Sequence, residues 1–355
     1  MAVDTGVEVE KRKKRKPNVF DVARVAGVSQ TTVSFVLNGS TTPRISDATT
    51  KRVLAAVEQL GYRRNTLARS LAHGKTMTVG MVLSSLDDDF HGVILRTCQE
   101  RLDEQGYQLL YVQAASGSAR EALMVQFLLE HRVDAVICFA HEYSTYIVPE
   151  WLSGMRDEGV PGVMIDSTRF ASMIDSVGSD DIDGMYKAMK HLYDLGHRRI
   201  ALVSDNWQPD LVPDRISGYD LAIERLGIDY NVQVGSDRRM NDIEKSAEMA
   251  RLLDGPEPPT AFVTYNDYTF EYFLMNYAGT RFRVPEDVSL VGYGNLYLSR
   301  FAKLTSVGQR PEEIGRVAAE CVLARLKNPD RPLRKVEIET ELVVRSSTAP
   351  PRPVS

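Results

Sequence analysis

The segment from Asp21 to Gly39 restricts the fold of this chain more than any other part of the sequence. It reads DVARVAGVSQTTVSFVLNG, which predicts two short helices joined by a tight turn at Gly27. Before the turn, the apolar residues recur at helical spacing: Phe20, Val22, Ala23 and Ala26. After the turn, Ser29 is placed to cap a helix that begins at Gln30. The pattern is that of a helix-turn-helix.

The second helix of this pair presents a polar and aromatic stripe. Its apolar residues are predicted to pack inward, and these are Val33, Val36 and Leu37. The residues left on its outer face are Gln30, Thr31, Ser34 and Phe35. Side chains near the start of such a helix read base edges in the DNA major groove. An ordinary helical hairpin in a protein core has the same local pattern and is the alternative for this segment alone.

A third helix is predicted from Thr49 to Leu60, with Ser46 or Asp47 as its cap and Gly61 as its end. Three helices can bury a small common core. The run from 65 to 71, NTLARSL, is compatible with a helix but has only about seven residues, too few to be stable alone in water. We therefore expect this run to fold only against DNA or a partner.

Charge is divided unevenly along the chain. Residues 1–75 contain 14 Lys and Arg against 6 Asp and Glu, a net charge of +8, whereas the whole chain carries −5, which leaves −13 for the remaining 280 residues. A basic end on an acidic body indicates nucleic-acid contact confined to that end. The densest basic run, KRKKRK at 11–16, is either a tether to phosphates or a solvated tail without a fixed role.

Composition limits the class of protein. A length of 355 residues suits a small head and a two-lobed body. The three cysteines, Cys98, Cys138 and Cys321, show neither pairing nor metal-ligand spacing. The charged N-terminus has no apolar signal core, and no apolar run of about 18 residues occurs. We therefore expect a reduced cytoplasmic protein that is neither secreted nor inserted in a membrane.

From Thr78 onward, buried strands alternate with amphipathic helices, which predicts parallel, doubly wound sheets. The first series has strands at 79–83, 108–112, 135–139 and 163–165, with helices near 93–105, 119–131 and 146–158. The second series begins at Asp175, with strands at 200–203, 232–235, 261–264 and 290–293, and helices near 181–195, 215–226, 242–254 and 267–278. Ligands of such lobes bind beyond the carboxyl ends of the strands. The corresponding loops are 84–91, 166–170, 265–267, 294–296 and the stretch before Arg215.

Over residues 18 to about 350, the chain resembles the LacI/GalR (lactose-repressor) family of bacterial transcription regulators. Beyond the helical head, the motifs that carry this resemblance are DSVGSDD at 175–181, LGHRRIALV at 195–203, DRISGY at 214–219, TAFVTYND at 260–267 and VPEDVSLVGYGN at 284–295. The resemblance implies a helix-turn-helix head, a hinge helix and two lobes of the periplasmic-binding-protein type. It also implies that a helix near 311–326 and a strand at 341–345 cross back between the lobes.

The resemblance implies a set of DNA contacts. The head would place Ser29, Gln30, Thr31, Thr32, Ser34, Phe35 and Asn38 against the operator, and the hinge helix would contribute Asn65, Ala68 and Leu71. An apolar wedge such as Leu71 kinks the duplex at a cost of a few kcal/mol, which is offset because the bent DNA touches more of the protein surface. The alternative for Leu71 is a linker leucine that packs on the core.

The resemblance likewise implies effector contacts, at Phe90, His91, Asp166, Arg215, Asn266 and Asn295. A planar guanidinium at Arg215 suits bidentate contact with hydroxyls or a carboxylate, and a salt bridge is its alternative. Asn266 is either a pocket donor or a helix cap. Phe90 either stacks on a ligand ring or closes the core of the lobe.

The sequence departs from the family pattern at several of these positions. Phe35 replaces a common arginine, and Arg64 replaces the proline that often precedes the hinge. The loop SSLDDDFH differs from the common DxSNPFF, Asn295 stands where an aspartate often binds sugar hydroxyls, and Asp166 lacks the arginine that often comes after it. One hypothesis is that Asp87 to Asp89 favour a neutral or cationic ligand, and the alternative is a solvated acidic loop.

Motifs of catalysis and metal binding are missing. No Gly-rich phosphate loop, HExxH, GxSxG or CxxC occurs, and the six histidines lack metal-ligand spacing. We expect no enzyme, no cofactor and no metal. The expected function is a ligand-responsive repressor that binds a near-palindromic operator as a homodimer, with a sugar, glycoside or nucleoside-like effector between the lobes. The alternative is a solute-binding protein of the same lobed fold without a regulatory role.

The expected boundaries follow from these segments. Residues 1–17 form a basic tail, 18–63 the helix-turn-helix domain, 64–75 the hinge and 76–355 the two-lobed domain. The first lobe is expected to comprise about 76–173 and 306–335, and the second about 174–305 and 336–350.

Overall fold

The computed structural model describes residues 17–37, 45–62, 74–83, 86, 89–114, 119–139, 150–166, 171–204, 214–235 and 240–352. The chain divides into two compact units, Met1–Thr76 and Met77–Ser355. We describe each unit by itself.

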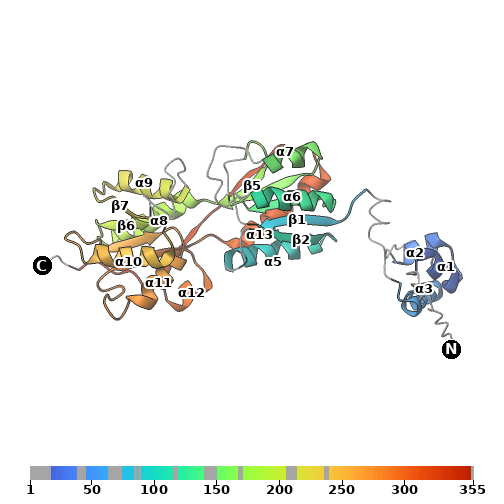
Figure 1. Cartoon of the computed structure of the whole chain (residues 1–355), viewed down its shortest axis with the longest axis horizontal. Helices are drawn as coiled ribbons and strands as arrows, with labels where there is room; N and C mark the ends of the chain where they lie inside the picture. Colours follow the sequence, from blue (N-terminus) through green and yellow to red (C-terminus); the bar gives the residue numbers. More distant parts are fainter. Residues whose placement is uncertain are drawn as a thin grey trace, which may run out of the picture. The chain divides into compact units, whose positions relative to one another are not determined.

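The first unit contains the three expected helices, α1 (Val19–Ala26), α2 (Gln30–Leu37) and α3 (Asp47–Leu60) (Figure 1). Val22, Val33 and Val53, one from each helix, are fully buried and form the centre of a small common core. Phe20, which the helical spacing places on the inner face, is instead 59% exposed, and its neighbour Val19 packs against the core. A one-residue error of this kind turns a side chain by about 100° around a helix of 3.6 residues per turn.

Side-chain caps define where these helices begin. Ser29 Oγ accepts a hydrogen bond of 3.1 Å from the backbone N–H of Thr32, as expected for the cap of α2. Ser46 Oγ accepts one of 3.3 Å from the N–H of Thr49, so Ser46 is the cap of α3 and Asp47 is its first residue. Gly27, with φ of 63°, forms the left-handed turn between α1 and α2.

The second unit contains two six-stranded sheets, one in each lobe (Figure 1). The first sheet is parallel throughout, in the order β11-β5-β4-β3-β1-β2. Its strands are β1 (Thr78–Leu83), β2 (Gln108–Gln113), β3 (Ala135–Phe139), β4 (Gly162–Ile165), β5 (Asp175–Ser179) and β11 (Lys335–Ile338). Helices α5 (Asp89–Asp103) and α13 (Pro311–Lys327) share one core cluster with it, and α6 (Ala119–Glu130) and α7 (Glu150–Asp157) share another.

The second sheet has the order β12-β10-β9-β8-β6-β7, with only β12 antiparallel. Its strands are β6 (Ile200–Val203), β7 (Val232–Val234), β8 (Ala261–Thr264), β9 (Ser289–Gly294), β10 (Thr305–Gly308) and β12 (Glu341–Val343). Helices α8 (Asp181–Asp194) and α9 (Asp214–Leu226) cover one face, and α10 (Asp242–Leu253) and α11 (Tyr268–Asn276) the other; the short α12 (Tyr297–Phe301) follows β9. The α/β prediction of two doubly wound lobes is therefore confirmed.

The lobe boundaries differ from those expected from the sequence. Strand β5 pairs with β4 in the first sheet, although the sequence pattern places its residues in the second lobe. Strand β10 pairs with β9 in the second sheet, and β11 pairs with β5 in the first. The chain thus crosses between sheets after β5, β10 and β11. Apolar runs reveal buried parallel strands but not which sheet they join, because the central strands of both sheets, such as β3 and β8, are buried on both faces.

Two further properties of the second unit bear on its chemistry. Its three cysteines, Cys98, Cys138 and Cys321, are all free and buried. Among the residues that the structure describes, no helix is both long enough and apolar enough to cross a membrane.

Candidate functional site

The outer face of α2 matches the stripe expected to read DNA. Gln30, Thr31 and Ser34 are exposed, and Phe35 is 41% exposed although it is a large aromatic side chain. The stripe faces outward because Val33 on the opposite side of α2 is fully buried against α1 and α3. Thr32 lies partly inside, where its hydroxyl is 2.8 Å from that of Ser29. The other four predicted DNA contacts, Asn38, Asn65, Ala68 and Leu71, lie outside the described residues.

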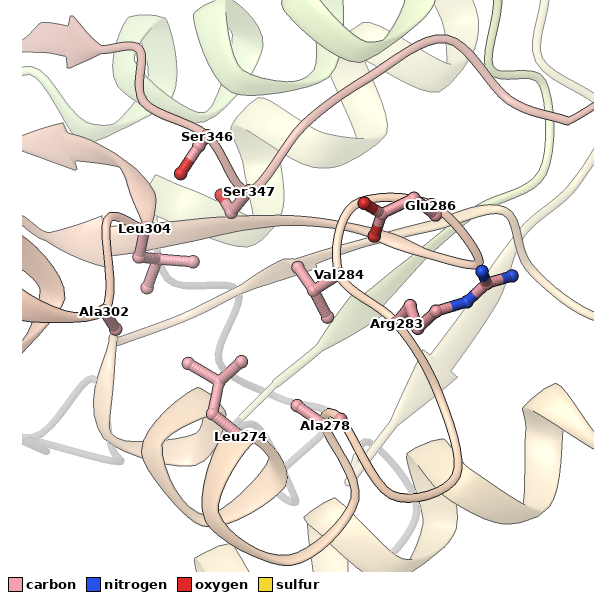
Figure 2. Close-up of a pocket in the computed structure, with 10 residues that line it drawn as sticks. Leu274, Ala278, Arg283, Val284, Glu286, Ala302, Leu304, Ser346 and Ser347 are labelled. Carbon is pink, nitrogen blue, oxygen red and sulfur yellow. The ribbon is translucent and has the colours of Figure 1, made fainter.

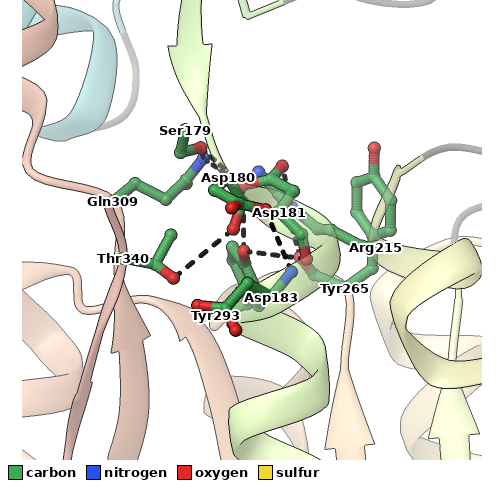
Figure 3. A network of polar contacts seen from close by, with 9 residues as sticks. All are labelled: Ser179, Asp180, Asp181, Asp183, Arg215, Tyr265, Tyr293, Gln309 and Thr340. Atoms are coloured by element: carbon green, nitrogen blue, oxygen red, sulfur yellow. Dashed lines mark hydrogen bonds and ion pairs between the residues drawn. The ribbon is translucent and has the colours of Figure 1, made fainter. Parts of the chain in front are cut away.

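A polar network of the second unit surrounds Arg215, near the start of α9 (Figure 3). The Nε of Arg215 donates to Asp181 Oδ2 at 2.8 Å, and its Nη1 donates to the carbonyl oxygen of Tyr265 at 2.7 Å. The guanidinium carbon lies 4.6 Å from the ring centre of Tyr265 and 4.2 Å from that of Tyr293. Arg215 is therefore fixed by two hydrogen bonds and two aromatic rings.

A glycine lets α8 and α9 come close enough for this ion pair. A Cβ atom at Gly218 on α9 would clash with the backbone oxygen of Ile182 on α8. Glycine at position 218 therefore allows α9 to approach α8 closely. This approach places Arg215 directly beside Asp181, the first residue of α8. The side chains of the pair are only 8% and 13% exposed.

Asp181 accepts hydrogen bonds from side chains on several elements. Its Oδ1 accepts hydrogen bonds from Ser179 Oγ at 2.5 Å and Tyr293 OH at 2.9 Å, and Gln309 Nε2 lies 3.5 Å away. Burial raises the pKa of Asp181 above its usual value, and the Arg215 guanidinium and the hydrogen bonds from Ser179 and Tyr293 only partly oppose this rise. Burial also opposes the charge of Arg215, but the Asp181 carboxylate raises the pKa of Arg215 above its usual value. The two side chains form a buried ion pair, with 2.8 Å between Arg215 Nε and Asp181 Oδ2.

All three crossings between the lobes meet at this network. Ser179 ends β5, and its hydroxyl accepts a 2.8 Å hydrogen bond from Gln309, which follows β10. Thr340, between β11 and β12, donates to the carbonyl oxygen of Asp180 at 3.4 Å. A ligand that displaces any of these groups therefore acts on the segments that join the lobes.

Asp166, which follows β4, adds a second carboxylate to the network. Its backbone has a left-handed φ of 63°, and its N–H donates to the carbonyl oxygen of Val177 at 2.9 Å. The negative charge of Asp166 raises the pKa values of both Asp181 and Arg215. The structure thus brings two carboxylates and one guanidinium together at the carboxyl ends of strands.

Asn266 and Asn295 lie in a second group of hydrogen bonds, around Asp267. Asn266 Oδ1 accepts from the N–H of Tyr268 at 3.0 Å, so its side chain caps the turn that begins α11. Asn295 Oδ1 accepts from Arg345 Nη2 at 2.6 Å, and its N–H donates to Ser306 Oγ at 2.9 Å.

Asp267 is fully buried and joins the loops that follow β8 and β9. It accepts hydrogen bonds from Ser306 Oγ at 2.9 Å and from the N–H of Leu296 at 3.0 Å. Burial raises the pKa of Asp267, and these hydrogen bonds oppose that rise. The Asp267 carboxylate therefore has a structural role, because it connects the loops that follow β8 and β9 in the second lobe.

Phe90 and His91 lie in the core of the first lobe, in the first turn of α5. They are 8% and 2% exposed, and the His91 ring centre is 4.8 Å from that of Phe139. Both rings thus help to fill the core of the first lobe, as the alternative for Phe90 expects. Their role as effector contacts stays a prediction.

The two lobes also contact each other along α5. Asp89 Oδ2 accepts a 3.0 Å hydrogen bond from the N–H of Tyr297, and Leu296 packs into the core cluster of the first lobe. Nearby, Glu271 Oε1 is buried and has no hydrogen-bond partner in the described part of the chain. Burial, followed by the charges of Asp267, Asp242 and Asp89, raises the pKa of Glu271 to about 7.

A separate cavity of about 310 Å³ lies in the second lobe (Figure 2). Leu274, Val284 and Leu304 form its apolar lining, and Ser347 lies beside them. Ser347 Oγ already donates to the carbonyl oxygen of Leu290 and accepts from the N–H of Thr305, so it has little capacity left for a ligand. The cavity shares no residue with the Arg215 network. Among the described residues, no cluster of His, Cys, Asp or Glu has the arrangement to hold a metal ion.

Sequence reasoning found Arg215 and Asp166 and placed Tyr265 in a pocket loop, but it did not predict that these residues meet in one network. The network also contains Ser179, Asp181, Tyr265, Tyr293 and Gln309. Three of these directly follow or end a strand, which is the signal that could have pointed to them. Placing β5 in the wrong lobe concealed the position of Ser179 and Asp181.

Comparisons with known proteins agree with this architecture. The family described as bacterial regulatory proteins, lacI family, matches residues 18–65, and the periplasmic binding protein-like domain matches residues 189–348. The chain is 30% identical to the HTH-type transcriptional regulator DegA of Bacillus subtilis over 337 residues, covering 94% of this chain and 99% of DegA. It is also 30% identical to the HTH-type transcriptional repressor PurR of Photobacterium profundum, covering 93% of this chain and 98% of that protein.

Solved structures show the same fold. A lac repressor dimer bound to operator and the anti-inducer ONPF aligns with a TM-score of 0.79 at 23% identity, covering 94% of this chain and all of that one. The transcriptional regulator CelR in complex with cellobiose aligns with a TM-score of 0.64 at 28% identity, covering 93% of this chain and 99% of CelR. The relatives are transcriptional regulators and not enzymes. This chain therefore belongs to the lacI family of bacterial regulatory proteins, and it is a transcriptional regulator with a helix-turn-helix DNA-binding domain and a two-lobed ligand-binding domain.

Proposed function

We propose that this regulator is a repressor that binds a near-palindromic operator as a homodimer and responds to a small molecule held between its lobes. The observation that carries the proposal is the Arg215 network, because it contacts all three segments that join the lobes. A ligand at Arg215 therefore has a direct mechanical route to the relative position of the lobes. Such a ligand regulates only if its affinity differs between the two arrangements.

The head supplies sequence recognition. Gln30, Thr31 and Ser34 offer hydrogen bonds to base edges, and the exposed ring of Phe35 suits the methyl group of a thymine. Ser29, Thr32 and Asn38 flank this stripe and are proposed to contact the DNA beside it. In the hinge segment, Asn65, Ala68 and Leu71 are proposed to enter the minor groove, with Leu71 as the wedge.

Exposed apolar side chains support a dimer. Helices α11 and α12 carry four of them, and these are Tyr272, Met275, Tyr297 and Phe301. Met275 is 82% exposed and Phe301 68%, which is unusual for side chains of this size on a free surface. A two-fold dimer presents two heads related by symmetry, and two such heads require an operator of two similar half-sites.

The effector is proposed to contact Arg215, Asp166 and the loops that contain Asn266 and Asn295, and to reach the first turn of α5, which contains Phe90 and His91. A sugar, glycoside or nucleoside-like molecule offers the hydroxyl groups that these side chains bind. Relatives provide the analogy, since CelR was solved with cellobiose and an Enterococcus faecium regulator of this family with ribose. We expect the protein to act in the cytoplasm, where the DNA is.

Selection of genomic fragments tests the DNA half of the proposal. Full-length protein is mixed with fragmented DNA of its own genome at modest ionic strength, and bound fragments are sequenced. We expect a motif of two inverted half-sites centred about one helical turn apart. A matched variant with Gln30, Thr31 and Ser34 all replaced by alanine should lose the motif but keep the fold. Recovery of unrelated fragments by both proteins would contradict the proposal.

A thermal-shift screen tests the effector half. Sugars, nucleosides and amines are added to the purified protein, and every molecule that raises Tm is then assayed for its effect on operator affinity. A molecule that raises Tm and also changes operator affinity supports the proposal. Stabilising molecules that all leave operator affinity unchanged would contradict it.

A further inference from the structure

The Arg215 guanidinium is the cation expected to meet the effector, yet its charge is already matched. Asp181 Oδ2 lies 2.8 Å from Arg215 Nε, and both side chains are nearly buried. An incoming anion would have to compete with this carboxylate for the same guanidinium. A buried ion pair with good geometry attracts a third charge weakly, because its two fields largely cancel.

The position of Asp181 is fixed independently of Arg215. Ser179 and Tyr293 donate to its Oδ1 at 2.5 and 2.9 Å, while Arg215 donates to its Oδ2. Ser179 is in turn held by Gln309 at 2.8 Å. These donors come from β5, β9 and the segment after β10, so Asp181 cannot swing aside without breaking hydrogen bonds to both lobes.

A second carboxylate, Asp166, also acts on the pair. Its negative charge raises the pKa values of both Asp181 and Arg215. Two other cations of the second lobe have partners within the protein. Lys245 Nζ lies 3.3 Å from Asp242 Oδ1, and Arg345 donates to Asn295 at 2.6 Å. An anionic ligand at Arg215 would therefore lose its hydration and have to share the guanidinium with the carboxylate that already pairs with it.

We propose that Asp181 is the specificity-determining residue that excludes anionic effectors, so that the site takes a molecule bearing hydroxyl or amino groups and no net negative charge. In this arrangement, Arg215 acts as a neutralised, rigid hydrogen-bond donor and not as a free positive charge. The inference rests on the proposed effector site and states which chemical class of ligand that site admits.

The test uses inorganic phosphate as the anionic probe. The Tm of the full-length protein is measured in sodium phosphate and in sodium chloride of equal ionic strength at pH 7.5. Three proteins are compared: wild type, Asp181→Asn and Asp183→Asn. Asp183 is a matched control, since it lies on the same helix, its substitution removes the same charge, and its side chain is 43% exposed and pairs with Lys187.

We expect phosphate to raise the Tm of Asp181→Asn by about 2–4 °C over the chloride reference, because the substitution leaves Arg215 without its counter-charge. The Tm difference between phosphate and chloride should be the same for wild type and Asp183→Asn, and it should be smaller than for Asp181→Asn. The double variant Asp181→Asn with Arg215→Gln should lose the phosphate effect. A folded Asp181→Asn protein that ignores phosphate would overturn the proposal.

A measurement on the wild-type protein covers the case in which Asp181→Asn does not fold. The ¹⁵N resonance of Arg215 Nε, held in its hydrogen bond to Asp181, is followed while phosphate is added. We expect it to stay in place, and a saturating shift at millimolar phosphate would overturn the proposal. Failure of the protein to bind any operator would contradict the proposed function instead. The phosphate measurements would still test the role of Asp181, because they do not involve DNA.

Discussion

Phe35 shows how one side chain can carry recognition. It is a large aromatic residue on the outer face of a small domain whose core is otherwise well filled, and it is 41% exposed. No contact among the described residues of the first unit requires an aromatic side chain at that place. Contact with a base pair explains it, because a ring offers apolar area to a thymine methyl without losing many rotamers.

Replacing Phe35 with alanine should weaken discrimination at one position of each half-site. A lost apolar base contact costs about 1–3 kcal/mol at that position, while the neighbouring positions keep their preferences. A selection experiment on randomised operators, read by sequencing, measures this directly. Phe20→Ala serves as the control, since Phe20 is exposed on α1 and outside the stripe. Identical preference profiles for wild type and Phe35→Ala would refute the reading role.

Glu271 is the residue whose titration should be visible in the stability of the protein. Its pKa is raised from 4.5 to about 7 by burial and by three neighbouring carboxylates. In the window between these values the folded state binds more protons than the unfolded state, so the free energy of unfolding should fall as the pH rises through it. Glu271→Gln should remove this fall and stabilise the protein above pH 7.

Denaturant unfolding at several values between pH 5 and pH 8 measures the effect. Glu224→Gln is the matched control, because Glu224 is an exposed carboxyl on α9. Equal pH slopes for Glu271→Gln and wild type would show that Glu271 is not the titrating group.

At the scale of elements, Asp175 joins β5 to the helix that crosses back into the first lobe. Its side chain is fully buried, and it receives hydrogen bonds from Arg325 at 2.9 Å and Arg331 at 2.9 Å, and from the N–H of Arg334 at 2.7 Å. Burial opposes its charge, but these donors hold the pKa of Asp175 below its usual value of 3.8. The carboxylate thus fixes β5 against α13 and the loop before β11.

Replacing Asp175 with asparagine should lower the free energy of unfolding by about 3–5 kcal/mol, since it leaves two nearly buried guanidinium groups without a counter-charge. The loss should be complete above the usual carboxyl pKa and should shrink as the pH falls from that value through the lower pKa of the folded state, because the unfolded wild-type protein then binds a proton that the folded protein does not. Urea unfolding near pH 7 and near pH 3 checks both parts. Asp330→Asn, an exposed position in the same loop, is the control.

The same element shows where prediction from sequence ends. The helices and strands of both lobes could be located because buried parallel strands read as short apolar runs between amphipathic helices. The sheet that β5 joins could not be predicted, since β4 and β8 are equally apolar partners and only the tertiary pairing decides.

The candidate site divides in the same way. The motif DRISGY points to Arg215, but its partner Asp181 is 34 residues away and is brought near by the close approach of α8 and α9 at Gly218. The side chain of Asn266 can be identified as a cap only from its hydrogen bond with Tyr268. Local sequence reveals a residue type that suits a role, and long-range packing decides whether the role is filled.

At the scale of the whole molecule, the lobes and the hinge segment have to be coupled for the protein to regulate. The Arg215 network contacts the three segments that cross between the lobes. The hinge lies outside the described residues, and its wedge at Leu71 is a prediction.

Replacing Leu71 with alanine should reduce operator bending, because no apolar side chain then unstacks the base step. Operator affinity should fall about tenfold or more, because the contacts on the kinked duplex are lost. Dimerisation should be unchanged. Energy transfer between dyes at the two operator ends measures bending, and sedimentation measures the dimer. Equal bending by both proteins would count against the wedge.

Binding of the small molecule and binding of the operator are proposed to be coupled through Arg215. One titration measures this coupling directly. Operator affinity is measured by fluorescence anisotropy at fixed salt, with and without a saturating amount of a molecule found by thermal shift, for wild type and Arg215→Lys. We predict that the molecule changes the operator Kd of wild type by about 5-fold to 150-fold, in either direction, and that most of this change disappears in Arg215→Lys. An operator Kd that the molecule leaves unchanged in wild type, or changes equally in both proteins, would contradict coupling through Arg215.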